Sequence, residues 1–110
     1  MLESGVSQML STVTEHSFEI RTICQKHGVR RLELFGSAAR GDFDPTISDL
    51  DFLVEFISDD WHGAADRWFG LIEDLEALFG LKVDLVDTTV AKNPHFLGKI
   101  QPDRVVLYAA

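Results

Sequence analysis

Residues 34–54 read LFGSAARGDFDPTISDLDFLV, and the order of residue types in this stretch determines the fold that we expect. A short apolar-rich run over residues 31–35 is typical of a strand, and it stops at a Gly-Ser pair. Residues 38–48 contain glycine, proline and aspartate, which indicates a loop that opens with a turn of helix. Residues 49–56 then predict a second strand. The stretch therefore predicts two strands joined by a polar loop.

The Gly36-Ser37 pair has the chemistry of a phosphate-binding turn. A strand that ends just before a helical turn points backbone N–H groups toward an incoming anion. Glycine lets the backbone approach the anion closely, and the serine hydroxyl can donate a hydrogen bond to a phosphate oxygen. Arg40 suits bidentate contact with a phosphate, although the same residue is equally consistent with a surface cation. A Gly-Ser pair alone is common in loops, so its meaning depends on the residues beyond the loop.

Two aspartates come after the loop at positions 49 and 51. In a strand, Asp49 and Asp51 place both carboxylates on one face. The opposite face carries apolar side chains: Leu50, Phe52, Val54 and Phe56. Two carboxylates held so close repel each other unless a cation lies between them, and hard oxygen ligands of this kind suit magnesium bridged to phosphates. Asp84, inside the apolar run LKVDLV, is the candidate third acid, with structural pairing of its carboxylate as the alternative.

A calcium-binding loop is the competing interpretation of the acidic residues in this region. Counted from Asp42, the sixth position is Ile47 and the twelfth is Leu53, where an EF-hand needs glycine and glutamate. The calcium interpretation therefore fails, and Asp42 and Asp44 are expected to be turn residues. The histidines show no metal-ligand spacing: His16, His27, His62 and His95.

Helical and strand patterns also flank this stretch. The remaining predicted elements are a helix over residues 6–27 ending at Gly28, a helix over residues 61–79 ending at Gly80, a strand over residues 81–86, a helix from Asn93-Pro94 to Ile100, and a last strand or buried tail over residues 105–108. Asp59 or Asp60 is expected to cap the second of these helices. Alternation of helices and strands predicts an α/β or α+β domain, with a small mixed β-sheet flanked by helices.

The composition predicts a single domain over residues 1–110, which is soluble and cytoplasmic. The hydrophobic content of 45% is enough for an ordinary core, and the single cysteine, Cys24, excludes an internal disulfide. No apolar run has the length of about 20 residues that a membrane span needs. The formal net charge of −8 argues against general binding of nucleic acid, because such binding depends on surplus positive charge.

The Gly-Ser turn, the loop and the Asp-x-Asp strand together resemble the signature of the DNA polymerase β-like nucleotidyltransferase superfamily. Gly36 and Ser37 match the turn that holds the triphosphate, and Asp49 and Asp51 match the pair that binds two magnesium ions. Asp84 has the position of the third carboxylate, which activates the acceptor hydroxyl. The loop holds eleven residues where the family usually has ten. The resemblance implies the polymerase β-like nucleotidyltransferase fold, and its core covers residues 30–87.

The segment over residues 93–110 is similar to small members of the superfamily, the minimal nucleotidyltransferases that are paired with HEPN-domain ribonuclease toxins. This resemblance implies an antitoxin that transfers AMP from ATP, with two Mg²⁺ ions, to a tyrosine of its toxin partner. Larger relatives append a helical domain that holds the acceptor. None is present in these 110 residues, so we expect a partner protein to present the acceptor.

Two rival interpretations come from other functional classes. The first is an antitoxin without catalytic activity that neutralises its partner by steric cover. The second is nucleotidyl transfer to RNA or to a small molecule, which the acidic charge and the lack of a substrate domain disfavour. Apolar residues over 61–79, Phe69 among them, exceed what one small sheet can cover. This surplus predicts a protein interface, and the acidic charge elsewhere would suit a basic partner.

Overall fold

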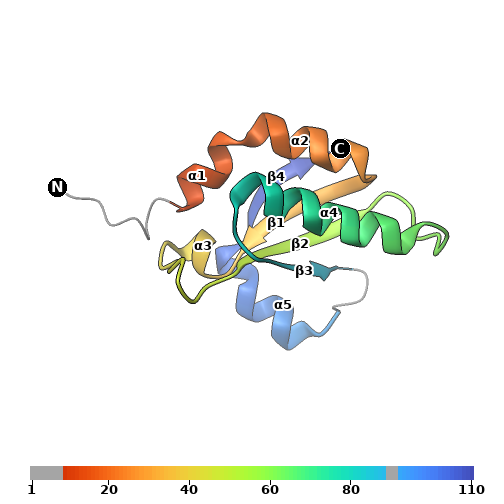
Figure 1. The fold of residues 1–110 in the computed structure, drawn as a ribbon. Helices are drawn as coiled ribbons and strands as arrows, with labels where there is room; N and C mark the ends of the chain where they lie inside the picture. The colour runs from red at the N-terminus through yellow and green to blue at the C-terminus, as the bar shows by residue number, and fades with distance from the viewer. Residues whose placement is uncertain (1–8, 89–91) are drawn as a thin grey trace.

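The computed structural model describes residues 9–88 and 92–110 of the chain. In these residues four strands form one sheet in the order β3-β2-β1-β4 (Figure 1). The strands are β1 (Val29–Phe35), β2 (Leu50–Phe56), β3 (Val83–Asp87) and β4 (Val105–Ala109). Strand β1 pairs antiparallel with both β2 and β4, whereas β2 and β3 are parallel. The predicted fold class, a small mixed sheet flanked by helices, is confirmed.

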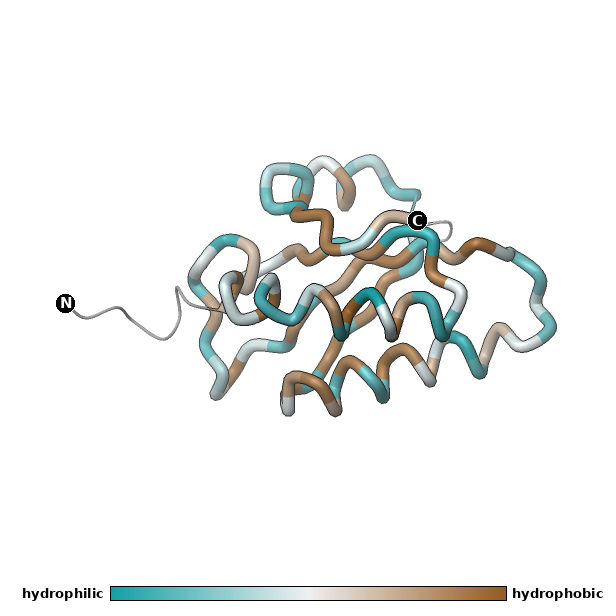
Figure 2. Tube along the Cα trace, turned by 90° about the horizontal axis from the view of Figure 1, so that it is seen from above, coloured by the Kyte–Doolittle hydropathy of each residue, from teal (hydrophilic) through white to brown (hydrophobic). Residues whose placement is uncertain are grey.

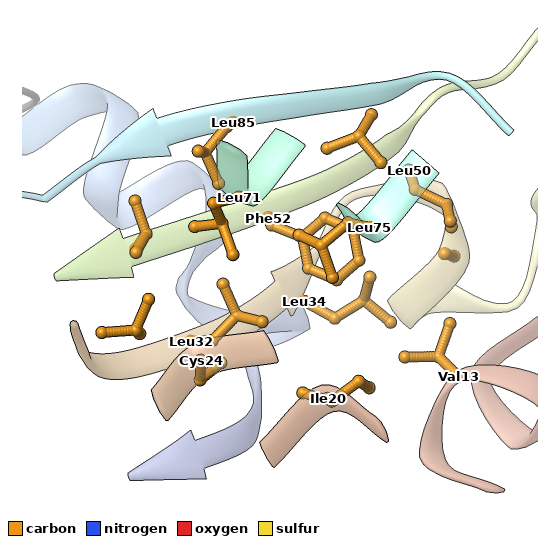
Figure 3. Packing of buried hydrophobic residues seen from close by; sticks show 14 of the residues in the cluster. Val13, Ile20, Cys24, Leu32, Leu34, Leu50, Phe52, Leu71, Leu75 and Leu85 are labelled. Carbon is orange, nitrogen blue, oxygen red and sulfur yellow. The ribbon is translucent and has the colours of Figure 1, made fainter. Parts of the chain in front are cut away.

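Helices cover the two faces of the sheet unequally (Figure 1). Helices α1 (Met9–Glu15), α2 (Ser17–Lys26) and α4 (Ala64–Phe79) pack on one face, over the main core. Figure 3 shows labelled members of that core: Val13, Ile20, Cys24, Leu32, Leu34, Leu50, Phe52, Leu71, Leu75 and Leu85. Helix α5 (Pro94–Ile100) packs on the other face, where Ile100 meets Phe35 and Leu53. Figure 2 shows the hydrophobic residues concentrated along the strands, with polar residues in most of the loops.

The crossover from β2 to β3 explains why α4 is long. Two parallel strands cannot be joined by a tight turn, so the chain must return along the sheet before β3 begins. Helix α4 provides this return and buries Leu71 and Leu75 against the strands. The predicted helix end at Gly80 is confirmed, since Gly80 has the left-handed φ of 66° and its N–H donates to the Glu76 carbonyl.

The predicted helix over residues 6–27 is wrong in one respect, because the described part is divided at His16. Its backbone torsions (φ −98°, ψ 29°) leave the helical region, and its Nδ1 lies 2.8 Å from the Thr12 carbonyl oxygen. Val13 and Ile20 are seven residues apart and both are buried, so the apolar spacing continued through the break. Val6 lies outside the described residues. Gly28, the predicted stop, has a positive φ of 68°.

The start of α4 also differs from the prediction. Residue Gly63, with a φ of 74°, is the N-cap, so the helix begins three residues after Trp61. Instead of capping the helix, the Asp60 carboxylate accepts a hydrogen bond from the His62 N–H, 3.0 Å away, and closes a turn that precedes it. Trp61 therefore lies in a loop and not on the helical stripe. The third strand begins two residues later than predicted, at Val83.

The predictions for residues 93–110 agree with the structure. The Asn93 side chain caps α5 by accepting a hydrogen bond from the His95 N–H, and Pro94 occupies the first helical turn. Residues 105–109 form a strand at the edge of the sheet, which decides between the two predicted alternatives. None of the helices within residues 9–88 and 92–110 combines the length and the apolar composition that a membrane span requires.

Candidate active site

The end of β1 forms the predicted Gly-Ser turn. Gly36 has φ 76° and ψ −154°, and the short helix α3 (Ser37–Arg40) starts directly after it. The Gly36 carbonyl accepts the N–H groups of Ala39 and Arg40, at 3.1 and 3.0 Å. Backbone of this kind favours glycine strongly, because a side chain clashes with the main chain at such torsions. The turn is therefore fixed by the glycine at position 36.

Gly36 lies directly against the carboxylate of Asp51. The strand register pairs Phe35 with Asp51, so the turn after Phe35 reaches the Asp51 side chain. A Cβ atom added at position 36 would overlap Asp51 Oδ2 and lie 3.1 Å from Asp51 Cγ. The missing side chain of Gly36 thus makes room for the carboxylate. The phosphate-type turn and the Asp-x-Asp motif, 13 residues apart in the sequence, form one site.

Asp84 is the direct neighbour of Asp51 in the sheet, since the parallel register of β2 and β3 pairs the two residues. Asp51 is partly buried and Asp84 is exposed. Asp49 does not belong to the strand as predicted, because β2 starts at Leu50, whose N–H donates to the Lys82 carbonyl. The position of Asp49 therefore depends on the preceding loop rather than on strand alternation.

The electrostatics of Asp51 show that the charges of Asp84 and Asp49 act on its carboxyl group. The pKa of Asp51 is raised from 3.8 to about 6, mainly by burial and then by the charges of Asp84 and Asp49. The Arg40 guanidinium opposes this rise in pKa. Within residues 9–88 and 92–110, however, no three side chains are gathered closely enough to hold a metal ion as they stand. The three acids thus concentrate negative charge at the site, but their side chains do not surround a position for a metal ion.

Arg40 links the turn to the segment that comes after α5. Its guanidinium forms ion pairs with Asp103 at 3.6 Å and with Asp42 at 3.4 Å. Asp103 ends the short 3-10 helix η2 (Gln101–Asp103) and was not among the predicted site residues. Asp44 is a turn residue as predicted, because its carboxylate accepts hydrogen bonds from the Thr46 N–H and hydroxyl. Arg40 thus combines a surface ion pair with an electrostatic effect on Asp51.

One charged cluster near the site was not predicted. Glu33 in β1 is only 2% exposed, and its carboxylate binds Arg104 Nε and Arg31 Nε, each at 2.6 Å. The hydrogen bond from Arg104 is the main cause that lowers the pKa of Glu33, against the opposing effect of burial. The sequence signal was an acid in an apolar strand with an arginine two residues before it. The cluster joins β1 to the residue that leads into β4.

The comparison with protein families decides the assignment. The model of the nucleotidyltransferase domain family matches residues 19–107, which include the Gly-Ser turn and all three acids. The chain belongs to this family. As a member of the nucleotidyltransferase family, it is an enzyme of the transferase class. The match ends two residues before the last residue of β4, so nearly all of the described fold belongs to the family domain.

Curated relatives of this nucleotidyltransferase include a protein of Methanocaldococcus jannaschii, named as a candidate protein adenylyltransferase. The two chains are 36% identical over 95 residues, which cover 79% of this chain and 93% of the relative. The protein adenylyltransferase MntA of Thermococcus cleftensis is 38% identical over 81 residues, covering 74% of this chain and 75% of the relative. This chain is similar to both proteins over most of its length.

Solved structures share the fold of this nucleotidyltransferase. One is a candidate minimal nucleotidyltransferase, with a TM-score of 0.71 and 29% identity over 87% of this chain and 93% of that one. Another is a complex of a tri-AMPylated HEPN toxin from Shewanella oneidensis with an MNT antitoxin. Its TM-score is 0.60 at 18% identity, covering 89% of this chain and 73% of that chain. At this identity the second likeness concerns the fold alone.

Proposed function

We propose that this nucleotidyltransferase transfers AMP from magnesium-bound ATP to a tyrosine hydroxyl of a partner HEPN-domain ribonuclease toxin, and that it acts as the antitoxin of that partner. The observation that supports this function best is the contact between the Gly36 turn and Asp51, beside Asp84 in the register of the sheet. A phosphate-type turn and a group of repelling carboxylates are what a metal-bound triphosphate requires.

The residues present fit magnesium by their chemistry. Asp49, Asp51 and Asp84 offer hard oxygen donors, and the pKa of Asp51 is raised mainly by burial and further by the negative charges of the other two. A cation held by all three requires their side chains to turn toward one another, because the described side chains do not form such a group as they stand. Two magnesium ions, when bound, supply the positive charge that stabilises the transferring phosphoryl group and the leaving pyrophosphate.

The proposed chemistry assigns each remaining residue a role. The backbone at Gly36 and the hydroxyl of Ser37 bind the triphosphate, and Arg40 adds a cation on the same side. Asp84 orients the acceptor hydroxyl and accepts its proton. The acceptor oxygen then forms a bond to the α-phosphorus, and the bond between the α-phosphorus and the bridging oxygen breaks. Pyrophosphate leaves with that electron pair, and AMP remains on the acceptor.

A protein acceptor is supported by the curated relatives, two of which carry the name protein adenylyltransferase at 36% and 38% identity. The Shewanella complex shares only its fold with this chain, so it suggests the kind of partner to test and nothing about the contacts. The net charge of −8 disfavours RNA as the acceptor, because the phosphate backbone would be repelled.

The test is incubation of the purified chain with ATP, Mg²⁺ and the HEPN-domain protein that we expect to be encoded beside it, with intact-mass measurement of both proteins afterwards. We expect the HEPN protein to gain one or more AMP groups, and tryptic mapping should place them on tyrosine. Asp49→Asn combined with Asp51→Asn should abolish the gain and leave the thermal melt cooperative. If this double variant still neutralises the ribonuclease as well as the wild-type chain does, inhibition depends on binding and the catalytic proposal is wrong.

A further inference from the structure

The carboxyl ends of β2 and β3 border a cavity at the opposite end of the sheet from the acids. It has a volume of about 260 Å³, and its lining includes Phe56, Asp59, Asp60, Trp61, Arg67 and Asp87. Figure 1 shows the β2–α4 connection, which carries Asp59, Asp60 and Trp61, far from α3 and the Gly-Ser turn. The five residues from Asp51 to Phe56 correspond to about 16 Å along the strand. The cavity is thus separate from the nucleotide site.

Hydrogen bonds hold the loop around this cavity in one shape. The Arg67 guanidinium lies over the Phe56 ring, 5.9 Å from its centroid, and donates to the carbonyls of Asp60 and His62. The Ser58 hydroxyl accepts the Asp60 N–H at 3.1 Å, and the Asp60 carboxylate accepts the His62 N–H. A loop that is already ordered loses little entropy when a partner binds it.

This ordered loop presents large apolar side chains to solvent. Trp61 is 78% exposed and stacks on the His62 ring at 4.2 Å, while Ile57 is 56% exposed. Single exposed apolar residues are ordinary on protein surfaces. A tryptophan on a fixed loop at the edge of a cavity is different, because tryptophan is enriched among the residues that dominate binding energy at interfaces. We call Asp59, Asp60, Trp61 and Asp87, which all line the cavity, the Trp61 surface.

The charge of the Trp61 surface selects the chemistry of its partner. Asp59, Asp60 and Asp87 contribute carboxylates to the cavity lining. Arg67 also lines the cavity, but its single positive charge is outnumbered by these three acids, and its terminal nitrogens already donate to the carbonyls of His62 and Asp60. An anionic ligand such as a phosphate or RNA would meet the carboxylates. A cationic side chain would be attracted by them and could lie against the Trp61 ring.

We propose that the Trp61 surface is a docking site for a protein segment that carries a lysine or arginine flanked by apolar side chains. The apolar flanks pack on Trp61, and the cationic side chain enters the cavity beside the acids. The partner is the acceptor protein, and in this identification the inference rests on the proposed function. Docking at this cavity, whose Phe56 lies about 16 Å along β2 from Asp51, anchors the acceptor protein while its hydroxyl reaches the nucleotide.

The experiment measures binding of the purified HEPN-domain acceptor by calorimetry at low and at high salt. Trp61→Ala, and Asp59→Asn combined with Asp60→Asn, should each raise the dissociation constant at least tenfold. Phe18→Ala is the matched control, because Phe18 is a 72% exposed aromatic residue on α2 outside the cavity lining, and it should change the constant less than twofold. In AMP transfer, Trp61→Ala should raise KM for the acceptor tenfold or more with kcat within twofold of wild type. Salt should weaken wild-type binding more than binding of the asparagine double variant.

The outcomes separate this inference from the proposed function. If the acceptor binds and the Trp61 and asparagine variants weaken it, but no AMP is transferred, the docking surface stands and the proposed function fails. If AMP is transferred and the Trp61→Ala variant binds as wild type does, the inference alone is overturned. An acceptor that does not bind at all contradicts both. A wild-type homodimer in ultracentrifugation that Trp61→Ala converts to monomer would make the surface a self-association interface, which also overturns the inference.

Discussion

At the scale of single residues, Gly36 and Gly41 offer a comparison between backbone strain and contact with the site. Both have a positive φ, 76° and 94°, but an added Cβ meets Asp51 only at position 36 and has no described atom within 4 Å at position 41. Gly41→Ala should therefore cost about 1–2 kcal/mol, the strain of left-handed backbone alone. Gly36→Ala should cost about 3 kcal/mol or more, because overlap with a packed neighbour is added. Denaturant unfolding measures both, and equal losses would contradict the contact.

Asp51 should make the stability of the metal-free protein depend on pH. Its pKa in the folded protein is about 6, above the ordinary value of 3.8, so the folded state binds the proton more tightly than the unfolded chain does. The stability that this provides is fully present below pH 3.8 and is lost as the pH rises toward and through 6. Asp51→Asn, which stays neutral, should stabilise the protein in EDTA at pH 7.5 by about 1 kcal/mol, a value reduced for solvent screening.

The measurement is a pair of thermal melts in EDTA at pH 7.5 and near pH 3.5. For a domain of this size, 1 kcal/mol corresponds to about 4–8 °C in Tm. The gain from Asp51→Asn should disappear at the acidic pH, where the aspartate is itself protonated. Asp66→Asn, in the first turn of α4 and remote from the acid pair in the sequence, is the control and should show no such pH-dependent gain. A gain of the same size at both pH values would mean that the gain does not come from the ionised carboxylate of Asp51.

The roles of the candidate site residues stay predictions, and only their positions can be compared with the structure. Asp51 and Asp84 lie on neighbouring strands, as the resemblance implied for the third acid, but Asp49 lies just outside its strand. The pairing of Arg40 with Asp103 could not be predicted, because it joins segments 63 residues apart whose approach depends on where α5 packs. Glu33 was missed for a similar reason. Its partner Arg104 is 71 positions away, and only the pairing of β1 with β4 brings the two together.

At the scale of elements, the spacing of apolar residues predicted which segments form helices and strands, but it did not predict where helices break or begin. The apolar residues of 9–27 keep one helical spacing through His16, although the backbone leaves the helix there. The spacing therefore does not reveal the break. Trp61 fits the stripe of α4 at helical spacing, yet Gly63 and the hydrogen bond to Asp60 begin the helix later. Local hydrogen bonds accompany both the break at His16 and the late start of α4. The edge strand β4 was ambiguous in the sequence, since only its pairing with β1 distinguishes a strand from a buried tail.

Two glycines inside helices should respond in opposite directions to the same substitution. In α4, a Cβ at Gly70 would lie 2.6 Å from His27 Cε1, and the His27 ring is held by Asp74 at 2.7 Å. Gly98 in α5 has no described atom within 4 Å of such a Cβ. Gly70→Ala should cost about 1–3 kcal/mol from overpacking, despite its better helix propensity. Gly98→Ala should gain about 0.5–1 kcal/mol from propensity alone.

Denaturant unfolding of the two alanine variants and the wild-type chain gives these free energies directly. The double variant Gly70→Ala with His27→Ala should recover part of the loss, because it removes the ring that the new methyl group meets. A gain in stability for Gly70→Ala alone would show that His27 moves aside at no cost, and the contact between α2 and α4 would then be looser than the structure has it.

At the scale of the whole molecule, the fold class and the family could be derived from one stretch of sequence, whereas the arrangement of the sheet could not. The order β3-β2-β1-β4 places the acids of β2 and β3 beside the turn after β1, and it places the Trp61 loop at the other end. Strand order results from long-range pairing, which local periodicity does not encode. The result is a molecule with a proposed nucleotide site at one end of its sheet and a proposed partner site at the other.

The cluster of acids also has a consequence for the stability of the whole molecule. We expect ATP and the metal to stabilise the fold only when both are bound. ATP adds negative charge to a chain with a net charge of −8, so without a divalent cation its phosphates should be repelled by Asp49, Asp51 and Asp84. In EDTA, ATP should leave Tm unchanged. With Mg²⁺ and ATP at 100 times the dissociation constant, binding should add about 2.7 kcal/mol to the free energy of unfolding.

Differential scanning fluorimetry with ATP alone, Mg²⁺ alone and both together measures this coupling. Because a domain of this size gains about 4–8 °C per kcal/mol, the combined shift should exceed 10 °C. The variant with Asp49→Asn and Asp51→Asn should show no additional shift when both are present, since it lacks the charges that need the cation. Ser37→Ala should keep a smaller shift, because it loses a single hydrogen bond to phosphate while the backbone donors remain. A full shift with ATP in EDTA would mean that the nucleotide binds without the metal, and the acids would then have another role.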